Sequence, residues 1–312
     1  MAVCSLSLSA CYKEIDLEQY RPKPTLVLNC VCSPDTVVRA SVSRTVFFTD
    51  HREDDPTLTD ATVSLTVNGV PTGTMRYDEA SKLYVSDVVP QAGDRIEIRA
   101  VHALGEAIGT DMIPEQIPVE RVGLKFRTYE DPDRIIVTPG GPVYGQSYEA
   151  TYRITFTDPA SVRNYYCIRI ENNNGIPAET LDYSHDKVFL AQQEIMDGVT
   201  TDTRIYGDEG RTFTDDLFDG QTYTMEIVQT APYYGRHSRP YRIILYSLSE
   251  PYYHYLTGIL NVDDESFNSD LVDWGFSEPN AYYSNVNGGT GIVGAVQCSV
   301  YTVDLESVMP AD

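Results

Sequence analysis

The chain has 312 residues, of which 42% are hydrophobic, so it is long enough for packed cores and for two domains. Its 46 acidic residues outnumber its 23 lysines and arginines, which gives a formal net charge of −23 at pH 7. A charge of this size repels polyphosphate, and it excludes nucleic acid as an expected partner. No segment reaches the roughly 20 apolar residues that a membrane-spanning helix needs.

A lipoprotein-type signal stands at the N-terminus. The run Leu8-Ser9-Ala10-Cys11 has a small-residue step that ends in cysteine, which is the pattern that a lipoprotein-processing peptidase reads. We therefore expect residues 1–11 to be a truncated signal peptide with its lipobox, and Cys11 to be the lipidated first residue of the mature protein. The residues before Cys11 lack the basic region and the long apolar core of a full signal. The alternative is that Cys4 and Cys11 are ordinary thiols of a frayed terminus.

A tether and a first β-rich domain follow. Residues 12–24 are polar and proline-containing, which predicts a semi-rigid tether. Within residues 25–118 the dominant hydrophobic period is two, as in Thr62–Val67, and Asn68-Gly69 then supplies the residues that a tight hairpin turn prefers. Strands with one polar face belong to antiparallel sheets. We expect residues 25–118 to form an immunoglobulin-like or transthyretin-like β-sandwich.

The second domain is expected to span residues 119–312, because two prolines interrupt the strand pattern within residues 114–122. Residues 148–157 again alternate between apolar and polar, while Ser249 is a credible N-cap for a helix near 249–262. The sequence therefore predicts an all-β, mainly antiparallel protein with two β-sandwich-like domains, the second with one packed α-helix. Further strands are expected at residues 25–32, 37–48, 165–171, 222–230, 241–246 and 295–303.

Cysteine use does not fix a disulfide pattern. Beyond the N-terminal segment the cysteines are Cys30, Cys32, Cys167 and Cys298. Cys30 and Cys32 are two residues apart on an expected strand, so they share a face and cannot pair readily with each other. Bridges to the other two remain open in an oxidising compartment, but four cysteines allow three full connectivities. Buried free thiols are the favoured state.

No catalytic or cofactor motif holds in context. The segment 289–294 matches the glycine pattern of a dinucleotide-binding loop, but it lacks the preceding apolar strand, the following helix and the later acidic residue. We expect it to be a glycine-rich bend that feeds the last strand. The histidines show no metal-ligand spacing, and no pair of carboxylates is singled out as a glycosidase pair. We therefore expect no enzymatic activity, no cofactor and no resident metal.

Tyrosine, with 23 copies, is the most distinctive residue type. Most tyrosines of a β-rich protein are half-buried strand residues. The loop with Tyr233, Tyr234, Arg236 and His237 lies between two expected strands, and exposed aromatic residues beside arginine are enriched at interfaces. These four residues are the candidate contacts for a partner or a sugar.

Several segments together resemble one family. They are Cys11 with Tyr12-Lys13-Glu14, Gly93-Asp94, residues 148–158 with Asn164-Tyr165-Tyr166, residues 247–253, Pro279 and residues 285–294. This set is similar to the outer-membrane lipoproteins of Bacteroidota in domain-of-unknown-function family 4249. The resemblance implies an all-β, two-domain lipoprotein that is often encoded beside TonB-dependent outer-membrane transporters, with no established activity and no catalytic residues. Lys13-Glu14 is also similar to the signal that sends lipoproteins of this phylum to the cell surface.

The functional expectation combines these observations. We expect a non-enzymatic lipoprotein anchored in the outer membrane through Cys11, at the cell surface or else at the periplasmic face. It would act as an accessory or binding component of a TonB-dependent transporter or another surface complex. The alternatives are a free-standing adhesin or glycan-binding lipoprotein, for which the loop aromatics would provide the contact, and a hydrolase with unrecognised carboxylates.

Overall fold

A computed structural model describes Gln19, residues 21–47, Asp50, and residues 55–190, 210–263 and 283–309; for helix residues 259–263 it describes the backbone alone. Strands account for 56% and helices for 7% of the structure. This content, with the mostly antiparallel strand pairs described below, confirms the predicted all-β fold with a packed helix.

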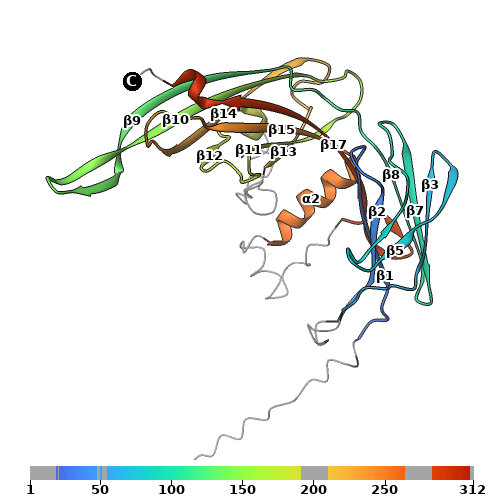
Figure 1. Ribbon diagram of the computed structural model, residues 1–312. Coiled ribbons are helices and arrows are strands. Elements are labelled where there is room, and N and C mark those ends of the chain that lie inside the picture. Colours follow the sequence, from blue (N-terminus) through green and yellow to red (C-terminus); the bar gives the residue numbers. More distant parts are fainter. Residues whose placement is uncertain are drawn as a thin grey trace, which may run out of the picture.

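The described strands form three sheets (Figure 1). The first contains β1 (Leu26–Cys32), β2 (Arg39–Arg44), β5 (Arg76–Asp78), β6 (Leu83–Val85), β11 (Tyr165–Asn172), β13 (Arg211–Thr214), β15 (Pro240–Leu248) and β17 (Thr290–Asp304). The second contains β9 (Arg121–Thr138), β10 (Gly141–Thr157), β12 (Leu181–Asp182) and β14 (Thr222–Pro232). The third contains β3 (Thr62–Val67), β4 (Val70–Thr74), β7 (Arg95–His102), β8 (Gly105–Met112) and β16 (Val286–Asn287).

The first sheet runs through both halves of the molecule in the order β13-β11-β15-β17-β1-β2-β6-β5. At its centre β1 pairs in parallel with β17, from Val27 opposite Thr290 to Cys32 opposite Ala295. The other strand pairs of the described residues are antiparallel. The two sandwiches therefore share a sheet, whereas the sequence pattern predicts two separate ones.

Two hydrophobic cores lie on this shared sheet. The second sheet covers one part of it, over a core that includes Tyr152, Phe156 and Tyr166. The third sheet covers the other part, over a core built from residues 26–113 together with Val286, Val293 and Ala295. Residues 286–295, which the sequence boundary at 118 assigns to the second domain, thus help to build the first core. Independent folding of 25–118 and 119–312 stays a prediction.

Local signals produce the expected turn and helix. Asn68 and Gly69 adopt positive φ angles of 52° and 78° and connect β3 to β4. Helix α2 (Glu250–Asp263) begins after Ser249, whose Oγ accepts hydrogen bonds from the backbone N–H groups of Tyr252 (3.4 Å) and Ala295 (3.0 Å). The cap therefore fixes the helix to β17 as well as starting it. Among the described helices, none has the length and apolar character to span a membrane.

Candidate interaction site

The loop between β14 and β15 lies at the end of the second sandwich. The backbone N–H of Tyr233 donates to the carbonyl of Gln146 (2.8 Å), and its ring lies 6.0 Å from that of Phe126. Tyr234 points outward with 73% of its surface exposed, and the Arg134 guanidinium lies 4.6 Å from its ring centre. The two neighbouring tyrosines therefore differ: Tyr233 packs against the sheet, and Tyr234 is exposed to solvent.

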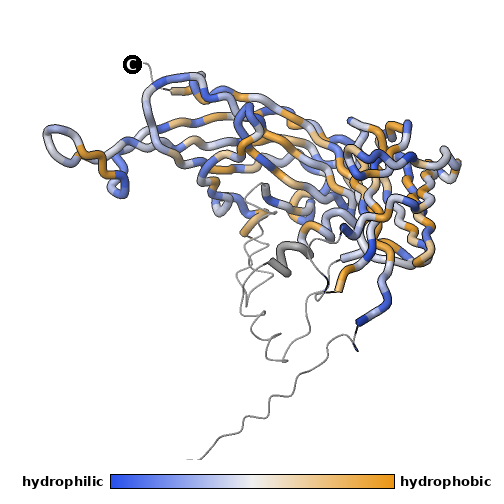
Figure 2. Tube along the Cα trace, turned by 60° about the horizontal axis from the view of Figure 1, so that its bottom comes forward, coloured by the Kyte–Doolittle hydropathy of each residue, from blue (hydrophilic) through white to orange (hydrophobic). Residues whose placement is uncertain are grey.

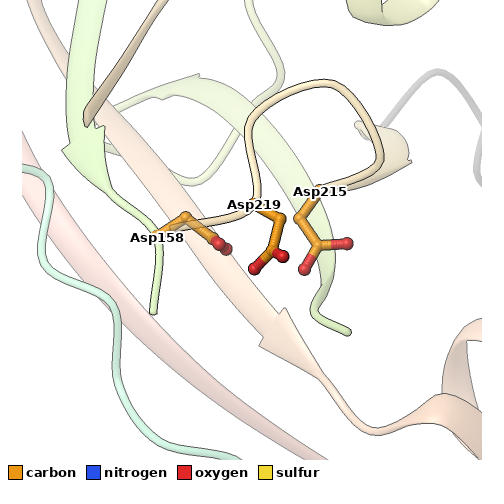
Figure 3. Close-up of side chains that lie close together, drawn as sticks. All are labelled: Asp158, Asp215 and Asp219. Carbon is orange, nitrogen blue, oxygen red and sulfur yellow. The ribbon is translucent and has the colours of Figure 1, made fainter. Parts of the chain in front are cut away.

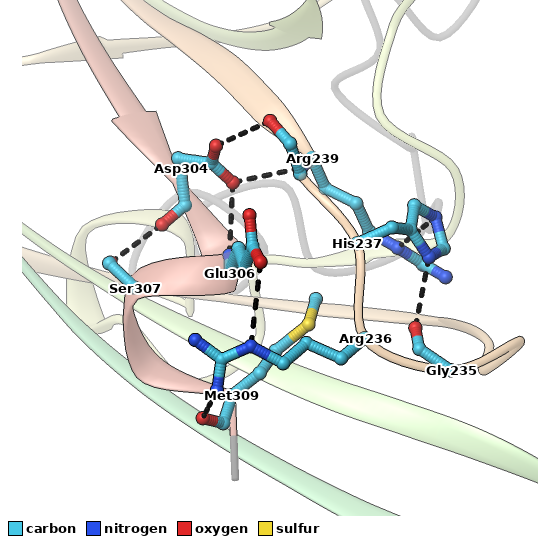
Figure 4. A network of polar contacts seen from close by, with 9 residues as sticks. Gly235, Arg236, His237, Arg239, Asp304, Glu306, Ser307 and Met309 are labelled. Carbon is cyan, nitrogen blue, oxygen red and sulfur yellow. Dashed lines mark hydrogen bonds and ion pairs between the residues drawn. The ribbon is translucent and has the colours of Figure 1, made fainter. Parts of the chain in front are cut away.

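Hydrogen bonds fix the rest of this loop (Figure 4). Arg236 is directed toward the C-terminal segment, where its Nε lies 3.4 Å from Glu306 and its Nη1 donates to the carbonyl of Met309 (3.3 Å). His237 Nδ1 contacts the carbonyl of Gly235 (2.9 Å), and its Nε2 accepts a hydrogen bond from Arg239 Nε (2.9 Å). These contacts assign the ring proton of His237 to Nδ1.

Asp304 is the anchor of this network. It accepts hydrogen bonds from the Ser238 hydroxyl (2.6 Å) and from the backbone N–H groups of Arg239 (2.8 Å) and Glu306 (3.0 Å). Partial burial raises its pKa, but these hydrogen bonds outweigh burial and hold the pKa below its usual value. These hydrogen bonds thus fix the end of the loop against the C-terminal segment.

A cavity of about 410 Å³ opens beside the loop, and Tyr234, His237 and Arg239 are among its lining residues. Gln229 and Tyr241 are also among its lining residues, and Gln229 Nε2 donates to the hydroxyl of Tyr241 (3.0 Å). Behind them the buried Tyr152 donates to Gln229 Oε1 (2.7 Å). Aromatic rings beside amide and guanidinium groups can stack on and hydrogen-bond a polar, uncharged ligand such as a sugar.

An acidic cluster lies elsewhere, where the loops after β10 and β13 meet (Figure 3). Oxygen atoms of Asp158, Asp215 and Asp219 lie within 4.8 Å of one another. Asp158 accepts hydrogen bonds from Tyr166 (2.5 Å) and the backbone N–H of Gly220 (2.9 Å). Burial, with the neighbouring Asp158 charge, raises the pKa of Asp215. Asp215 and Asp219 accept hydrogen bonds from the backbone N–H groups of Asn164 (2.7 Å) and Ser161 (3.0 Å), so the three carboxylates tie the two loops together.

Asp111 lines a separate cleft of about 780 Å³ between the two sandwiches. The lining of this cleft also includes Glu115, Arg163 and Glu250. Burial raises the pKa of Asp111 to about 6, although hydrogen bonds from Ser249 and from backbone N–H groups oppose this. Its Oδ2 is buried without a hydrogen bond. Asp111 therefore contributes a carboxyl group with a raised pKa to the lining of this cleft.

The glycine-rich segment has a structural position. Residues 286–287 form β16, and Thr290 already begins β17, so no helix follows the glycines. A Cβ atom on Gly291 would lie 2.2 Å from the carbonyl oxygen of Leu28, and one on Gly294 would lie 2.8 Å from the Cβ of Tyr252. These glycines are needed because β1 and α2 approach β17 closely. The context is a strand, as the sequence indicates, and not a dinucleotide-binding turn.

The remaining predicted residues have simple placements. Cys11 lies outside the described residues. Cys30, Cys32, Cys167 and Cys298 are free, and the sulfur atoms of Cys30 and Cys32 are 3.4 Å apart on one face of β1. Sequence reasoning missed Arg134, which contacts the loop, and Arg239, which is its last residue. Arg239 could have been found from its position two residues after His237.

Fold and loop together define an all-β protein of two joined sandwiches that displays a rigid, aromatic loop. The chain belongs to the family described as Domain of unknown function (DUF4249), whose model matches residues 12–302. No curated protein matches the chain.

Two solved structures show a distant likeness. One is a Corynebacterium diphtheriae protein described as membrane anchored, with 11% identity, a TM-score of 0.21, and coverage of 72% of this chain and 54% of that chain. The other is a glycosyl hydrolase family 2 member from Bacteroides cellulosilyticus, with 12% identity, a TM-score of 0.20, and coverage of 75% and 28%. This chain thus spans about half of the first and about a quarter of the second. At these TM-scores the likeness carries no argument.

Proposed function

We propose that this protein is a non-enzymatic lipoprotein, anchored in the outer membrane through Cys11, that binds a partner as an accessory component of a TonB-dependent transporter or another surface complex. The observation that carries the proposal is the exposure of the Tyr234 side chain. A large aromatic side chain stands 73% exposed on a loop whose neighbours are fixed by hydrogen bonds. A preformed aromatic contact loses little conformational entropy on binding, so it suits a protein interface.

Charge indicates the kind of partner surface. With a net charge of −23, the protein encounters a surface that carries lysine and arginine faster than an acidic one. Exposed charges are screened by salt, since the Debye length falls from about 10 Å at 0.1 M to about 3 Å at 1 M. The proposed complex should therefore weaken as the salt concentration rises.

The test is chemical crosslinking in intact cells, followed by identification of the captured protein. Tyr234→Ala is the informative variant, because Tyr233 packs against Phe126 and Arg236 pairs with Glu306. Val70→Ala is a matched control, since Val70 is 64% exposed on β4 of the other sandwich. We expect the crosslinking yield to an outer-membrane protein to fall for Tyr234→Ala and not for the control. Robust hydrolytic turnover by the purified protein would refute the proposal.

Anchoring has its own test. With an intact upstream signal, Cys11→Ala should abolish labelling by a fatty-acid probe and should release the protein from membranes. Equal labelling of the variant would rule out the anchor.

A glycan-binding role is the second candidate, and the 410 Å³ cavity beside Tyr234 and Arg239 favours it. Arg239 also lies over the ring of Tyr148, at 4.9 Å from its centre. A glycan array with the purified protein separates the two proposals. If the protein binds a defined sugar and Arg239→Ala abolishes that binding, the glycan-binding role is supported. If no sugar on the array binds, the partner-binding role is favoured.

A further inference from the structure

The hairpin of β9 and β10 extends beyond the sheet to which it belongs. β14 pairs with β10 only over Ser147–Thr157, whereas β9 and β10 continue to pair out to Thr138 and Gly141. Between them the register shifts, so that residues 132–134 of β9 bulge out at the start of the extension. Figure 1 shows this ribbon projecting from the end of the second sandwich. We call residues 135–144 the hairpin tip.

The hairpin tip is apolar on both faces. Ile135 is opposite Tyr144, and Ile136 is opposite Val143, so the two pairs lie on different faces of the ribbon. The exposed fractions are 63% for Ile135, 84% for Val137 and 60% for Tyr144. The hydrophobic colour on the projecting ribbon is visible in Figure 2. Scattered exposed apolar residues are normal, but a contiguous group on a projecting element indicates an interaction surface.

The base of the hairpin tip is fixed to the loop described above. Arg134 Nη1 donates to the carbonyl of Gln146, and its guanidinium lies over the ring of Tyr234. Gly145 leaves room for this arrangement, because a Cβ atom there would lie 2.9 Å from the Arg134 side chain. The same carbonyl of Gln146 accepts from the backbone N–H of Tyr233. Arg134 therefore connects the base of the hairpin tip to the loop that carries Tyr234.

The charge distribution at this surface restricts its occupant. No charged residue occurs between Ile135 and Gln146, but Glu130, Asp131 and Asp133 lie just below the hairpin tip. Within the part of the chain that the structure describes, none of these three carboxylates forms an ion pair. Asp131 accepts hydrogen bonds from the Ser147 hydroxyl (2.6 Å) and from the backbone N–H of Asp133 (3.1 Å). An anionic membrane surface would repel them at the depth of the lipid headgroups, and a second copy of this chain would bring like charges together.

We propose that the hairpin tip inserts into an apolar cleft of a different protein, with lysine and arginine at the rim of the cleft facing Glu130, Asp131 and Asp133. The inference deepens the proposed function, because it names the surface and the chemistry of the partner. An apolar ribbon buried in such a cleft loses its contact with water, while the carboxylates at its base gain counter-charges.

The test is site-specific photocrosslinking of the full chain in the cells that make it. A benzoylphenylalanine placed at Val137 or at Tyr144 should crosslink to one protein, at an apolar segment flanked by lysine or arginine. The same probe at Val70, which is similarly exposed on β4, should not reach that protein. Adducts with lipid, with a second copy or with nothing would overturn the inference. Crosslinks from position 234 without any from 137 and 144 would overturn it too, yet leave the proposed function standing.

Variants then separate binding from folding. Val137→Asn should weaken the complex by about thirtyfold, the effect of losing a central interface residue, and should leave the melting temperature unchanged because Val137 is exposed. Val70→Asn is the control, because it makes the same change at a similarly exposed position away from the hairpin tip. Asp133→Lys should also weaken the complex, and a lysine-to-glutamate change at the crosslinked rim should restore it. Vesicles of phosphatidylethanolamine and phosphatidylglycerol should not bind the unlipidated protein; binding that Val137→Asn removes would instead assign the hairpin tip to the membrane.

Discussion

Gly291 provides the sharpest test of how the two halves are joined. Its φ angle is +114°, and an added Cβ atom would lie 2.2 Å from the carbonyl oxygen of Leu28 and 2.7 Å from Oδ1 of Asn29. Gly73 on β4 has a similar φ angle of +121° but no atom within 4 Å of the added Cβ. Gly73→Ala therefore measures the backbone strain alone, and Gly291→Ala measures the same strain plus the collision with β1.

Positive-φ strain costs about 1–3 kcal/mol for a residue with a side chain. At Gly291 the obstacle is backbone in the parallel β1–β17 pair, so relief requires part of that pairing to open. We expect Gly291→Ala to lower the free energy of unfolding by more than about 4 kcal/mol, a loss that only a few mechanisms produce, and Gly73→Ala by about 1–3 kcal/mol. Urea unfolding followed by circular dichroism measures both. Equal losses would refute the close approach of β1 to β17.

Substitutions at three other residues test the internal contacts. Asp158→Ala should cost about 1–3 kcal/mol because it leaves the buried hydroxyl of Tyr166 unpaired; a loss below about 0.5 kcal/mol, typical of a neutral surface change, would contradict the assigned role. Ser249→Ala should cost about 0.5–2 kcal/mol through the lost helix cap, and a Ser249→Thr variant that keeps the hydroxyl should retain more stability. The pKa of Asp111 is about 6 in the folded chain against an ordinary value of 3.8. Between these two pH values the folded chain keeps the proton that the unfolded chain has lost, so the free energy of unfolding falls as pH rises from about 4 to 6. Asp111→Asn should remove that slope and raise stability at pH 7 by up to about 3 kcal/mol, and a slope that persists in the variant would show that another group titrates.

The sequence predicted the features that are encoded locally. Period-two alternation and the Asn68-Gly69 turn depend on neighbouring residues, and both are confirmed in β3 and β4. The helix after Ser249 follows from a cap and a hydrophobic period of the same kind. These signals are independent of which strand packs on the other side of the core.

The parallel pair of β1 and β17 could not be predicted in this way. Val27 and Thr290 are at opposite ends of the chain, and nothing near either residue specifies a parallel partner. The glycines within residues 288–294 are an indirect sign of this pairing, because Gly291 is needed where the backbone of Leu28 approaches β17. From the sequence alone the same glycines fit any tight bend.

The candidate site was predicted in part. The loop was found because aromatic residues stood between two expected strands, but neighbouring tyrosines look alike in sequence, and only the packing of Tyr233 on Phe126 leaves Tyr234 exposed. Strand β9 and the hairpin tip were missed. Pro139-Gly140 between two apolar runs was the available signal, and it resembles the turn of a buried hairpin, since exposure depends on where β14 ends.

Isolation of the native protein from membranes tests the central claim most directly. The protein would be extracted in mild detergent at low salt, and the mass and composition of the particle that carries it would be determined. We expect a complex with another outer-membrane protein that dissociates as salt is raised, because the −23 charge contributes to association. A monomer without any partner, at low salt and from intact membranes, would contradict the claim that this protein functions by binding a membrane partner.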